Sequence, residues 1–117
     1  DTITVRDQQH WDVVIKAMTE VVHSARGTAR RIGEDSPWTI AGKTGTAQVY
    51  GLKQEEKYDA EAIPEELRDH ALFIAFAPVE NPKIAVAVII EHGGGGGSIA
   101  APVARAILDA YLPGPSS

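Results

Sequence analysis

The spacing of apolar residues near the beginning of the chain predicts an amphipathic helix from Asp7 to about Ser24. Apolar side chains recur there at every third or fourth position, which places them along one face of a helix. Thr4, which precedes Asp7 by three positions, is the candidate cap of the helix N-terminus. The residues on the apolar face are Trp11, Val14, Ile15, Met18, Val21 and Val22.

Three later segments, residues 38–49, 70–77 and 83–91, have the apolar and β-branched content that is typical of strands. The short segment 78–82 begins and ends with proline and joins the last two, so we expect them to pair as an antiparallel hairpin. Residues 84–90 are almost wholly apolar, which predicts that this strand is covered on both faces.

A second amphipathic helix is predicted after a run of five glycines, Gly93 to Gly97. Ser98 is the candidate cap, and Pro102 falls in the first turn, where proline is tolerated. We expect the glycine run to be a flexible turn; an anion cradle and an introduced linker are the alternatives. The apolar face of the helix is expected to consist of Ile99, Val103, Ile107, Leu108, Tyr111 and Leu112.

Two polar segments connect these elements. Residues 25–37 contain two glycines and end in proline, so we expect a surface connection. Residues 51–69 carry charges of both signs and are long for a hairpin connection, which favours either a functional lip or a mobile loop. The glutamates of this segment are interpreted as solvated side chains and not as acid/base pairs. They are Glu55, Glu56, Glu61, Glu65 and Glu66.

Together these elements predict one domain of the α/β class, of the α+β type, in which N- and C-terminal helices flank an antiparallel sheet of three strands. With 117 residues, of which 44% are apolar, the chain is long enough for one small core. A strand covered on both faces needs more cover than two helices provide. We therefore expect further covering material in a longer parent protein.

Charge and composition exclude several classes of function. The net charge of −5 argues against a nucleic-acid partner, because phosphate binding needs clustered lysine and arginine. The absence of cysteine excludes a disulfide framework and a thiolate metal site. No ligand spacing relates His10, His23, His70 and His92, so we predict neither a metal nor another cofactor.

The beginning of the sequence has no targeting signal. No stretch reaches the roughly 20 apolar residues of a membrane span, and the first residues lack the basic and apolar regions of a signal peptide. The sequence also begins without methionine. We expect it to be a piece of a longer protein whose anchor or export signal lies upstream.

The segment with the strongest chemical pattern is Lys43-Thr44-Gly45-Thr46. The period of two in a strand sends Lys43 and Gly45 to one face and both threonines to the other, although a twisted edge strand can present all of them to a cleft. Lys43 would supply positive charge, and the hydroxyls of Thr44 and Thr46 would bind a terminal carboxylate. The backbone N–H of Thr46 would serve an oxyanion hole, and Gly45 would admit a substrate close to the strand.

This segment has two other interpretations. Lys-Thr-Gly is a common tripeptide, and by itself it is more often a solvated edge strand than a site. Gly42-Lys43-Thr44 also resembles the end of a phosphate-binding loop. That motif, G-x-x-x-x-G-K-[ST], needs a glycine at position 37, where this sequence has Pro37, so the phosphate loop is excluded.

The surroundings of the motif resemble a known family. The turn 27–29, the blocks 42–52 and 68–78, the glycine run and the closing helix occur in the order seen in class B penicillin-binding proteins, most closely those of rod-shape elongation. The resemblance implies the transpeptidase fold shared with serine β-lactamases. It also implies that residues 1–117 are the C-terminal portion of that domain.

The resemblance implies a peptidoglycan D,D-transpeptidase that forms a serine acyl-enzyme on a D-Ala-D-Ala stem peptide and is trapped by β-lactams. Lys43 then corresponds to the lysine that contributes electrostatics and proton relay. Thr44, Gly45 and Thr46 correspond to the substrate-binding wall, and the Thr46 N–H to an oxyanion donor. The implied partners are stem peptides, β-lactams, the remainder of the same domain and membrane proteins of the elongation machinery, at the periplasmic face of the inner membrane.

The sequence departs from the family in one respect that bears on activity. It contains neither the Ser-x-x-Lys that supplies nucleophile and base nor the Ser-x-Asn of the second motif, because Ser24, Ser36 and Ser98 lack the required followers. We expect the chain alone to be inactive. Two alternatives stay open: a non-catalytic folding or interaction module, and a fragment of a serine β-lactamase or D,D-carboxypeptidase.

Overall fold

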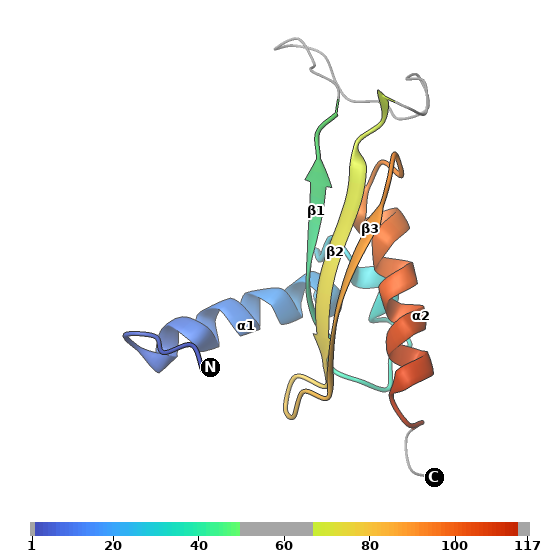
Figure 1. Ribbon diagram of the computed structural model, residues 1–117. Coiled ribbons are helices and arrows are strands. Elements are labelled where there is room, and N and C mark those ends of the chain that lie inside the picture. The colour runs from blue at the N-terminus through green and yellow to red at the C-terminus, as the bar shows by residue number, and fades with distance from the viewer. Residues whose placement is uncertain (1, 50–66, 115–117) are drawn as a thin grey trace.

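The computed structural model describes residues 2–49 and 67–114 and places two helices around a three-stranded sheet (Figure 1). This confirms the predicted class. The predicted polar segment 51–69 lies outside the described residues except for its end. The elements in chain order are α1 (Gln8–His23), η1 (Arg30–Ile32), β1 (Ala41–Ala47), β2 (His70–Ala77), β3 (Ile84–Ile90), the π-helical turn η3 (Gly96–Ala100) and α2 (Ala101–Tyr111).

The sheet has the order β1-β2-β3, and both neighbouring pairs are antiparallel. The predicted hairpin of β2 and β3 is therefore confirmed. β1 is shorter than the predicted strand 38–49, since it begins only at Ala41. Trp38 precedes it and packs, half-buried, against the core. Because β2 is central, its register fixes which residues of the two outer strands share a face.

One face of the sheet carries the core. Thr44 of β1, Phe73 of β2 and Val88 of β3 pair in register, and the alternate residues of β2 on this face are buried. Phe73 is fully buried and is among the largest buried side chains of the chain. α2 covers this face, and it reaches the sheet through small residues. The core residues of η3 and α2 are Ala100, Ala101, Ala104 and Leu108.

The buried face of α2 differs from the predicted one. Leu108 and Leu112 are buried as expected, but the other predicted positions are at least 40% exposed. The alanines allow a closer approach of the helix backbone to the sheet than branched side chains would, so the helix turns its small residues inward. Ser98 does not cap the helix, because its hydroxyl donates to the Gly95 carbonyl at 3.5 Å. The exposed positions are Ile99, Val103, Ile107 and Tyr111.

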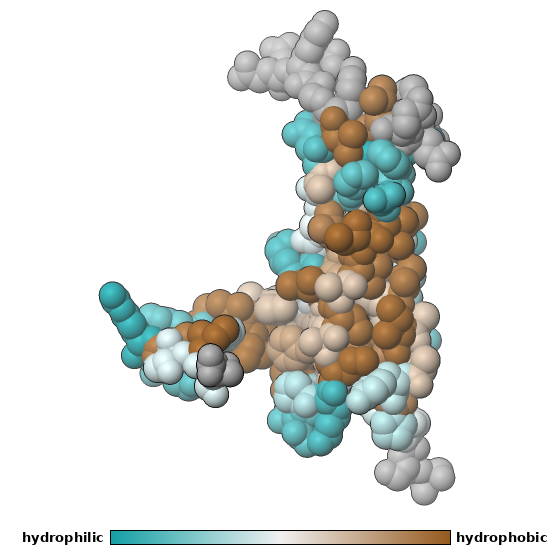
Figure 2. Space-filling view, in the orientation of Figure 1, coloured by the Kyte–Doolittle hydropathy of each residue, from teal (hydrophilic) through white to brown (hydrophobic). Residues whose placement is uncertain are grey.

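The prediction that β3 is covered on both faces is wrong for the residues that the structure describes. Its exposure alternates, with Val88 buried and Ile89 63% exposed. β3 lies at one edge of the sheet, and α2 covers only the face that carries Val88. Figure 2 shows brown, apolar side chains spread over the surface of the sheet. The nearly continuous apolar run of β3 therefore reflects a surface that nothing in the described part of the chain covers.

Helix α1 begins at Gln8, because the carboxylate of Asp7 caps it by accepting the Gln9 N–H at 2.9 Å. The predicted cap Thr4 is wrong: Asp7 itself has the extended backbone of a cap and the nearer side-chain acceptor. The helix projects away from the sheet (Figure 1) and packs against β1 near its C-terminal end. There the Ile40 N–H donates to His23 Nε2 at 2.9 Å.

The segment 25–37 is more than the expected surface connection. Ala29 and Ile32 belong to the core and are at most 5% exposed. Arg105 of α2 also binds this segment. Its Nη1 donates to the Ile32 carbonyl at 2.6 Å and to Asp35 Oδ1 at 2.8 Å. Its Nε donates to Asp109, which lies one turn further along α2. One guanidinium therefore joins η1 to α2.

We predict that Arg105→Met destabilises the chain by about 1–3 kcal/mol, because the Ile32 carbonyl loses a charged donor in a partly buried position. Asp35→Asn is the matched control. Because the Asp35 side chain is 85% exposed, solvent screens its ion pair and a smaller loss is expected. Urea unfolding of both variants at neutral pH measures the difference, and equal losses would contradict the role given to Ile32.

The same pair predicts a pH dependence. Hydrogen bonding to Arg105, and then its charge, lower the pKa of Asp35 below its ordinary value. A carboxyl with a depressed folded pKa stabilises the fold above its unfolded pKa, and this contribution is lost as pH falls through the folded pKa. The difference between Asp35→Asn and the unsubstituted chain should therefore vanish at strongly acidic pH. Urea midpoints measured across the acidic range check this, and a difference that grows on acidification would contradict it.

Candidate functional site

The predicted motif Lys43-Thr44-Gly45-Thr46 lies inside β1, at the edge of the sheet. Among the described residues β1 pairs with β2 alone, so the backbone groups of its outer edge face away from the sheet. Such an edge can receive an extended peptide as an additional strand. The motif therefore lies along an edge with which an extended peptide can pair.

The register confirms the predicted division of the motif between the two faces. Lys43 and Gly45 pair with Ile74 and Leu72 on the side of α1, and Thr44 and Thr46 share the face of the buried Phe73. Lys43 is exposed, and its ammonium donates to the Thr44 carbonyl at 2.9 Å. Thr46 is also exposed. A cation and a hydroxyl thus reach solvent from one strand, on opposite faces of the sheet.

Gly42, immediately before the motif, is required by packing. A Cβ at Gly42 would lie 2.5 Å from Cζ of the buried Phe73 ring, whereas a Cβ at Gly45 would approach only Leu72 Cβ, at 3.3 Å. The sequence predicted a special role for Gly45 and missed Gly42. The signal that could have revealed it is a glycine at an inward-facing position of a strand, where a close neighbour is the usual reason.

The glycine run packs against the backbone of β1. A Cβ at Gly96 would lie 2.7 Å from the Gly45 carbonyl oxygen and would also collide with the Leu72 carbonyl. Gly94 has a φ of 93°, which side chains rarely adopt, and its N–H donates to the Asp69 carbonyl at 2.9 Å. Gly94 and Gly96 are buried. The run is therefore a close-packed connection with specific backbone requirements, and the expectation of a flexible turn did not include this role.

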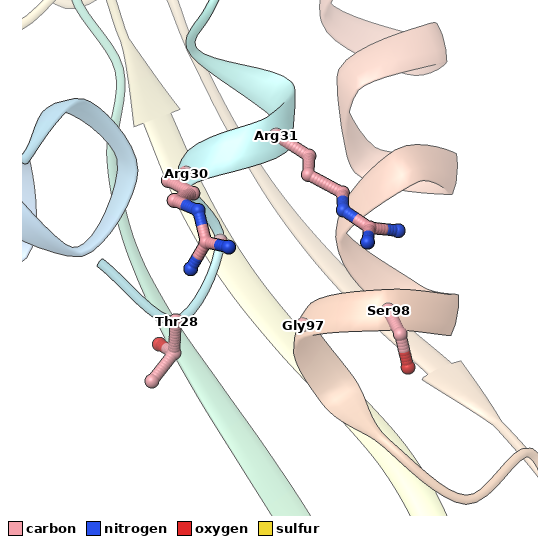
Figure 3. Close-up of a pocket in the computed structure, with 6 residues that line it drawn as sticks. Thr28, Arg30, Arg31, Gly97 and Ser98 are labelled. Atoms are coloured by element: carbon pink, nitrogen blue, oxygen red, sulfur yellow. The ribbon is translucent and has the colours of Figure 1, made fainter. Parts of the chain in front are cut away.

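A shallow cavity of about 230 Å³ lies beside this contact, between the turn that carries Thr28 and the start of η3. Figure 3 shows Thr28 on one side, Gly97 and Ser98 on the other, and the side chains of Arg30 and Arg31 extending toward them from η1. The Thr28 hydroxyl lies 3.3 Å from the Thr44 hydroxyl, and either can donate. The turn 27–29 thus reaches the motif from behind, which the spacing of the sequence alone did not reveal.

Two of the histidines meet at the beginning of β2. The His92 N–H donates to His70 Nδ1 at 3.0 Å, and the two rings pack edge to face with centroids 4.7 Å apart. His92 Nδ1 lies 3.2 Å from the Arg68 carbonyl, which can only accept, so this nitrogen donates. His70 is the first residue of β2, and His92 is half-buried. In the described part of the chain, no group of three or more potential ligand side chains is placed to hold a metal.

The chain is similar to one known family and to solved structures. The model of the penicillin-binding protein transpeptidase domain matches residues 2–109. The peptidoglycan D,D-transpeptidase MrdA of Haemophilus influenzae is 49% identical over 102 residues, which are 87% of this chain and 16% of that protein. The chain therefore spans about 16% of the length of this relative.

Solved structures give the same result. The crystal structure of Pseudomonas aeruginosa penicillin-binding protein 2 in complex with WCK 5153 has a TM-score of 0.78 and 47% identity, and the match covers 96% of this chain and 22% of that one. Helicobacter pylori penicillin-binding protein 2, solved in a complex with MreC, has a TM-score of 0.73 and 30% identity, with 94% and 19% covered.

We predict that Gly42→Ala destabilises the chain by about 1–3 kcal/mol, because the added methyl group must displace the buried ring of Phe73. Gly45→Ala, two positions along the same strand, is the matched control and should cost less than about 1 kcal/mol, since its nearest contact is 3.3 Å away. Thermal unfolding of the two variants makes the comparison. A larger loss for Gly45→Ala would show that the motif glycine, and not Gly42, is the packing requirement.

A second pair of variants tests the contact behind β1. Gly96→Ala should cost about 1–3 kcal/mol or more, because its new Cβ meets backbone atoms of two strands that cannot rotate away. Gly95→Ala meets only the Ser98 hydroxyl, at 2.9 Å, and that side chain can turn, so little change is expected. Urea midpoints provide the measurement. Equal effects would mean that the glycine run is not packed against β1.

Proposed function

This chain belongs to the penicillin-binding protein transpeptidase domain family, and we propose that residues 1–117 form the C-terminal portion of a peptidoglycan D,D-transpeptidase domain. The match agrees with the resemblance seen in the sequence. The observation that carries the proposed role is the position of Lys43 and Thr46, both exposed on β1, which is an edge strand of the sheet. That edge supplies the wall along which a stem peptide binds.

The proposed reaction is an acyl transfer in two steps. A serine hydroxyl adds to the carbonyl of the penultimate D-Ala, the C–N bond breaks, and the terminal D-Ala leaves with a proton on its nitrogen. An amine on a stem peptide of a neighbouring peptidoglycan strand then attacks the ester. This forms the cross-link and returns the serine hydroxyl. A β-lactam enters the first step and leaves the serine acylated.

Every residue of the motif takes part in this reaction. Lys43 supplies positive charge and proton relay at the reacting centre, and the hydroxyls of Thr44 and Thr46 bind the terminal carboxylate. The Thr46 N–H donates to the oxyanion that forms on the attacked carbonyl. Gly45 leaves the strand open to the substrate. The exposed positions of Lys43 and Thr46 support this assignment.

The serine comes from the remainder of the same domain in this proposal, because these 117 residues contain no Ser-x-x-Lys. The open apolar surfaces are where that remainder would pack. One lies on α1 and the outer face of the sheet, where Val13 is 67% and Ile74 50% exposed (Figure 2). The other consists of the exposed apolar residues of α2, Val103, Ile107 and Tyr111. Apolar surface of this extent favours a covering partner.

The proposed setting is the periplasmic face of the bacterial inner membrane, with peptidoglycan stem peptides and β-lactams as ligands. A membrane anchor would belong to the parent protein; in the described residues no helix combines the length and the apolar character of a membrane span. The Helicobacter pylori relative forms a complex with MreC. This supports membrane proteins of the elongation machinery as further partners.

A non-catalytic role stays the second candidate. β3 ends the sheet among the described residues, and its outward-facing Ile89 is exposed. A free edge next to apolar surface favours association with another strand. In isolation the chain would then act as a non-catalytic folding or interaction module whose role is to bind a partner. The names of the relatives favour the transpeptidase over a β-lactamase or carboxypeptidase.

Fluorescent penicillin tests the proposal. The chain alone should acquire no covalent label, because it lacks the serine motif. A polypeptide in which this chain replaces the matching segment of the Haemophilus influenzae relative should be labelled, since that relative provides the rest of the enzyme. Denaturing gels read out the label. Labelling of the chain alone, or none in the hybrid while the relative itself is labelled, would contradict the proposed function.

A further inference from the structure

The turn 27–29 contacts the proposed substrate wall from behind, and no part of the reaction above uses it. Its Thr28 hydroxyl lies 3.3 Å from that of Thr44, which is 16 positions away in the sequence. Thr44 is in the middle of β1, and its neighbours Lys43 and Gly45 belong to the wall. The contact is therefore made to the centre of the strand on which binding depends.

The backbone of this turn is fixed on both sides. On one side Ala29 is buried and its N–H donates to the Val21 carbonyl of α1 at 3.0 Å. On the other side the Thr28 carbonyl lies so close to Gly97 that no Cβ would fit between them. Thr28 thus presents its hydroxyl from a rigid support, while its own side chain is exposed.

The side chain of Thr44 lies between these two segments. Its hydroxyl meets Thr28, and its methyl group would be 3.5 Å from a Cβ at Gly97. A threonine hydroxyl has one proton and two acceptor lone pairs, so the contact with Thr28 leaves further hydrogen-bonding capacity for a ligand. The hydroxyl of Thr44 is consequently held by Thr28, while Gly97, which has no Cβ, leaves space for the methyl group.

We propose that Thr28 is a positioning residue that fixes the Thr44 hydroxyl, and with it the centre of β1, for binding of the substrate carboxylate. This rests on the proposed function of the wall. β1 has ladder hydrogen bonds on one side only in the described structure, so a support from behind limits its movement. Displacements of about 1 Å in a binding group can cost up to a hundredfold in rate, which makes such supports consequential.

The test uses the full-length enzyme that carries this chain, with the second-order rate constant of acylation by fluorescent penicillin as the readout. Thr28→Val keeps the shape and removes the hydroxyl, and we expect a two- to tenfold lower constant, roughly the value of one hydrogen bond. Thr28→Ser should restore it. Thr19→Val is the matched control, because the Thr19 hydroxyl donates to the Ile15 carbonyl within α1, and it should leave the constant unchanged.

A double-mutant cycle separates positioning from a general loss of structure. If Thr28 acts through Thr44, the variant with Thr28→Val and Thr44→Val should be no slower than Thr44→Val alone. Unchanged acylation by Thr28→Val, no rescue by Thr28→Ser, or losses that multiply would each overturn the inference. Should Thr28→Val fail to fold, Thr28→Ala, which removes the hydroxyl without bulk at this exposed position, is judged by the same outcomes.

The failures of the two proposals are distinguishable. An unsubstituted enzyme that is not acylated overturns the proposed function and this inference together. An unsubstituted enzyme that is acylated, beside a Thr28→Val variant of equal rate, overturns only the role of Thr28. Melting temperatures of the variants are measured in parallel, and a lower melting temperature with an unchanged acylation constant counts against positioning.

Discussion

Close backbone packing behind the edge strand is the constraint on which the candidate site depends. β1 has one strand neighbour among the described residues, so half of its backbone groups take no part in the sheet. Its position is fixed by β2 and by Gly96, whose backbone lies against Gly45. Only glycine permits this approach, because any Cβ would meet the backbone of the strand. The contact with Gly96 thus stabilises β1, and the edge of β1 that does not pair with β2 is left for a ligand.

The same arrangement explains why the molecule has an apolar surface. The core lies between α2 and one face of the sheet, and alanines there bring the helix close. The opposite face, with Ile74 and Ile89, has no such cover in the described residues, and α1 extends away from it. In a chain that spans 16% of its relative, these surfaces suit the remainder of a larger domain. The fold described here is one wall of the proposed site.

Much of this was predictable, and the failures have a common cause. The strands β2 and β3 and the two faces of the motif were predicted correctly, because periodicity and turn residues act over a few neighbouring positions. The buried face of α2 was predicted wrongly, since Val103 and Ile107 are more apolar than Ala104 yet are exposed. Hydropathy ranks residues by their preference for burial, but the close packing of α2 on the sheet places small side chains at the contact.

The sequence by itself determined the family, the order of the elements and the motif that faces the proposed substrate, because each depends on residue identity at fixed spacing. The tertiary structure decided which glycines are required and what supports the motif. Thr28 and Thr44 are 16 positions apart, and Gly96 and Gly45 much further, so no local pattern relates them. Only folding brings these backbones together, and their contact holds the edge of the sheet in place.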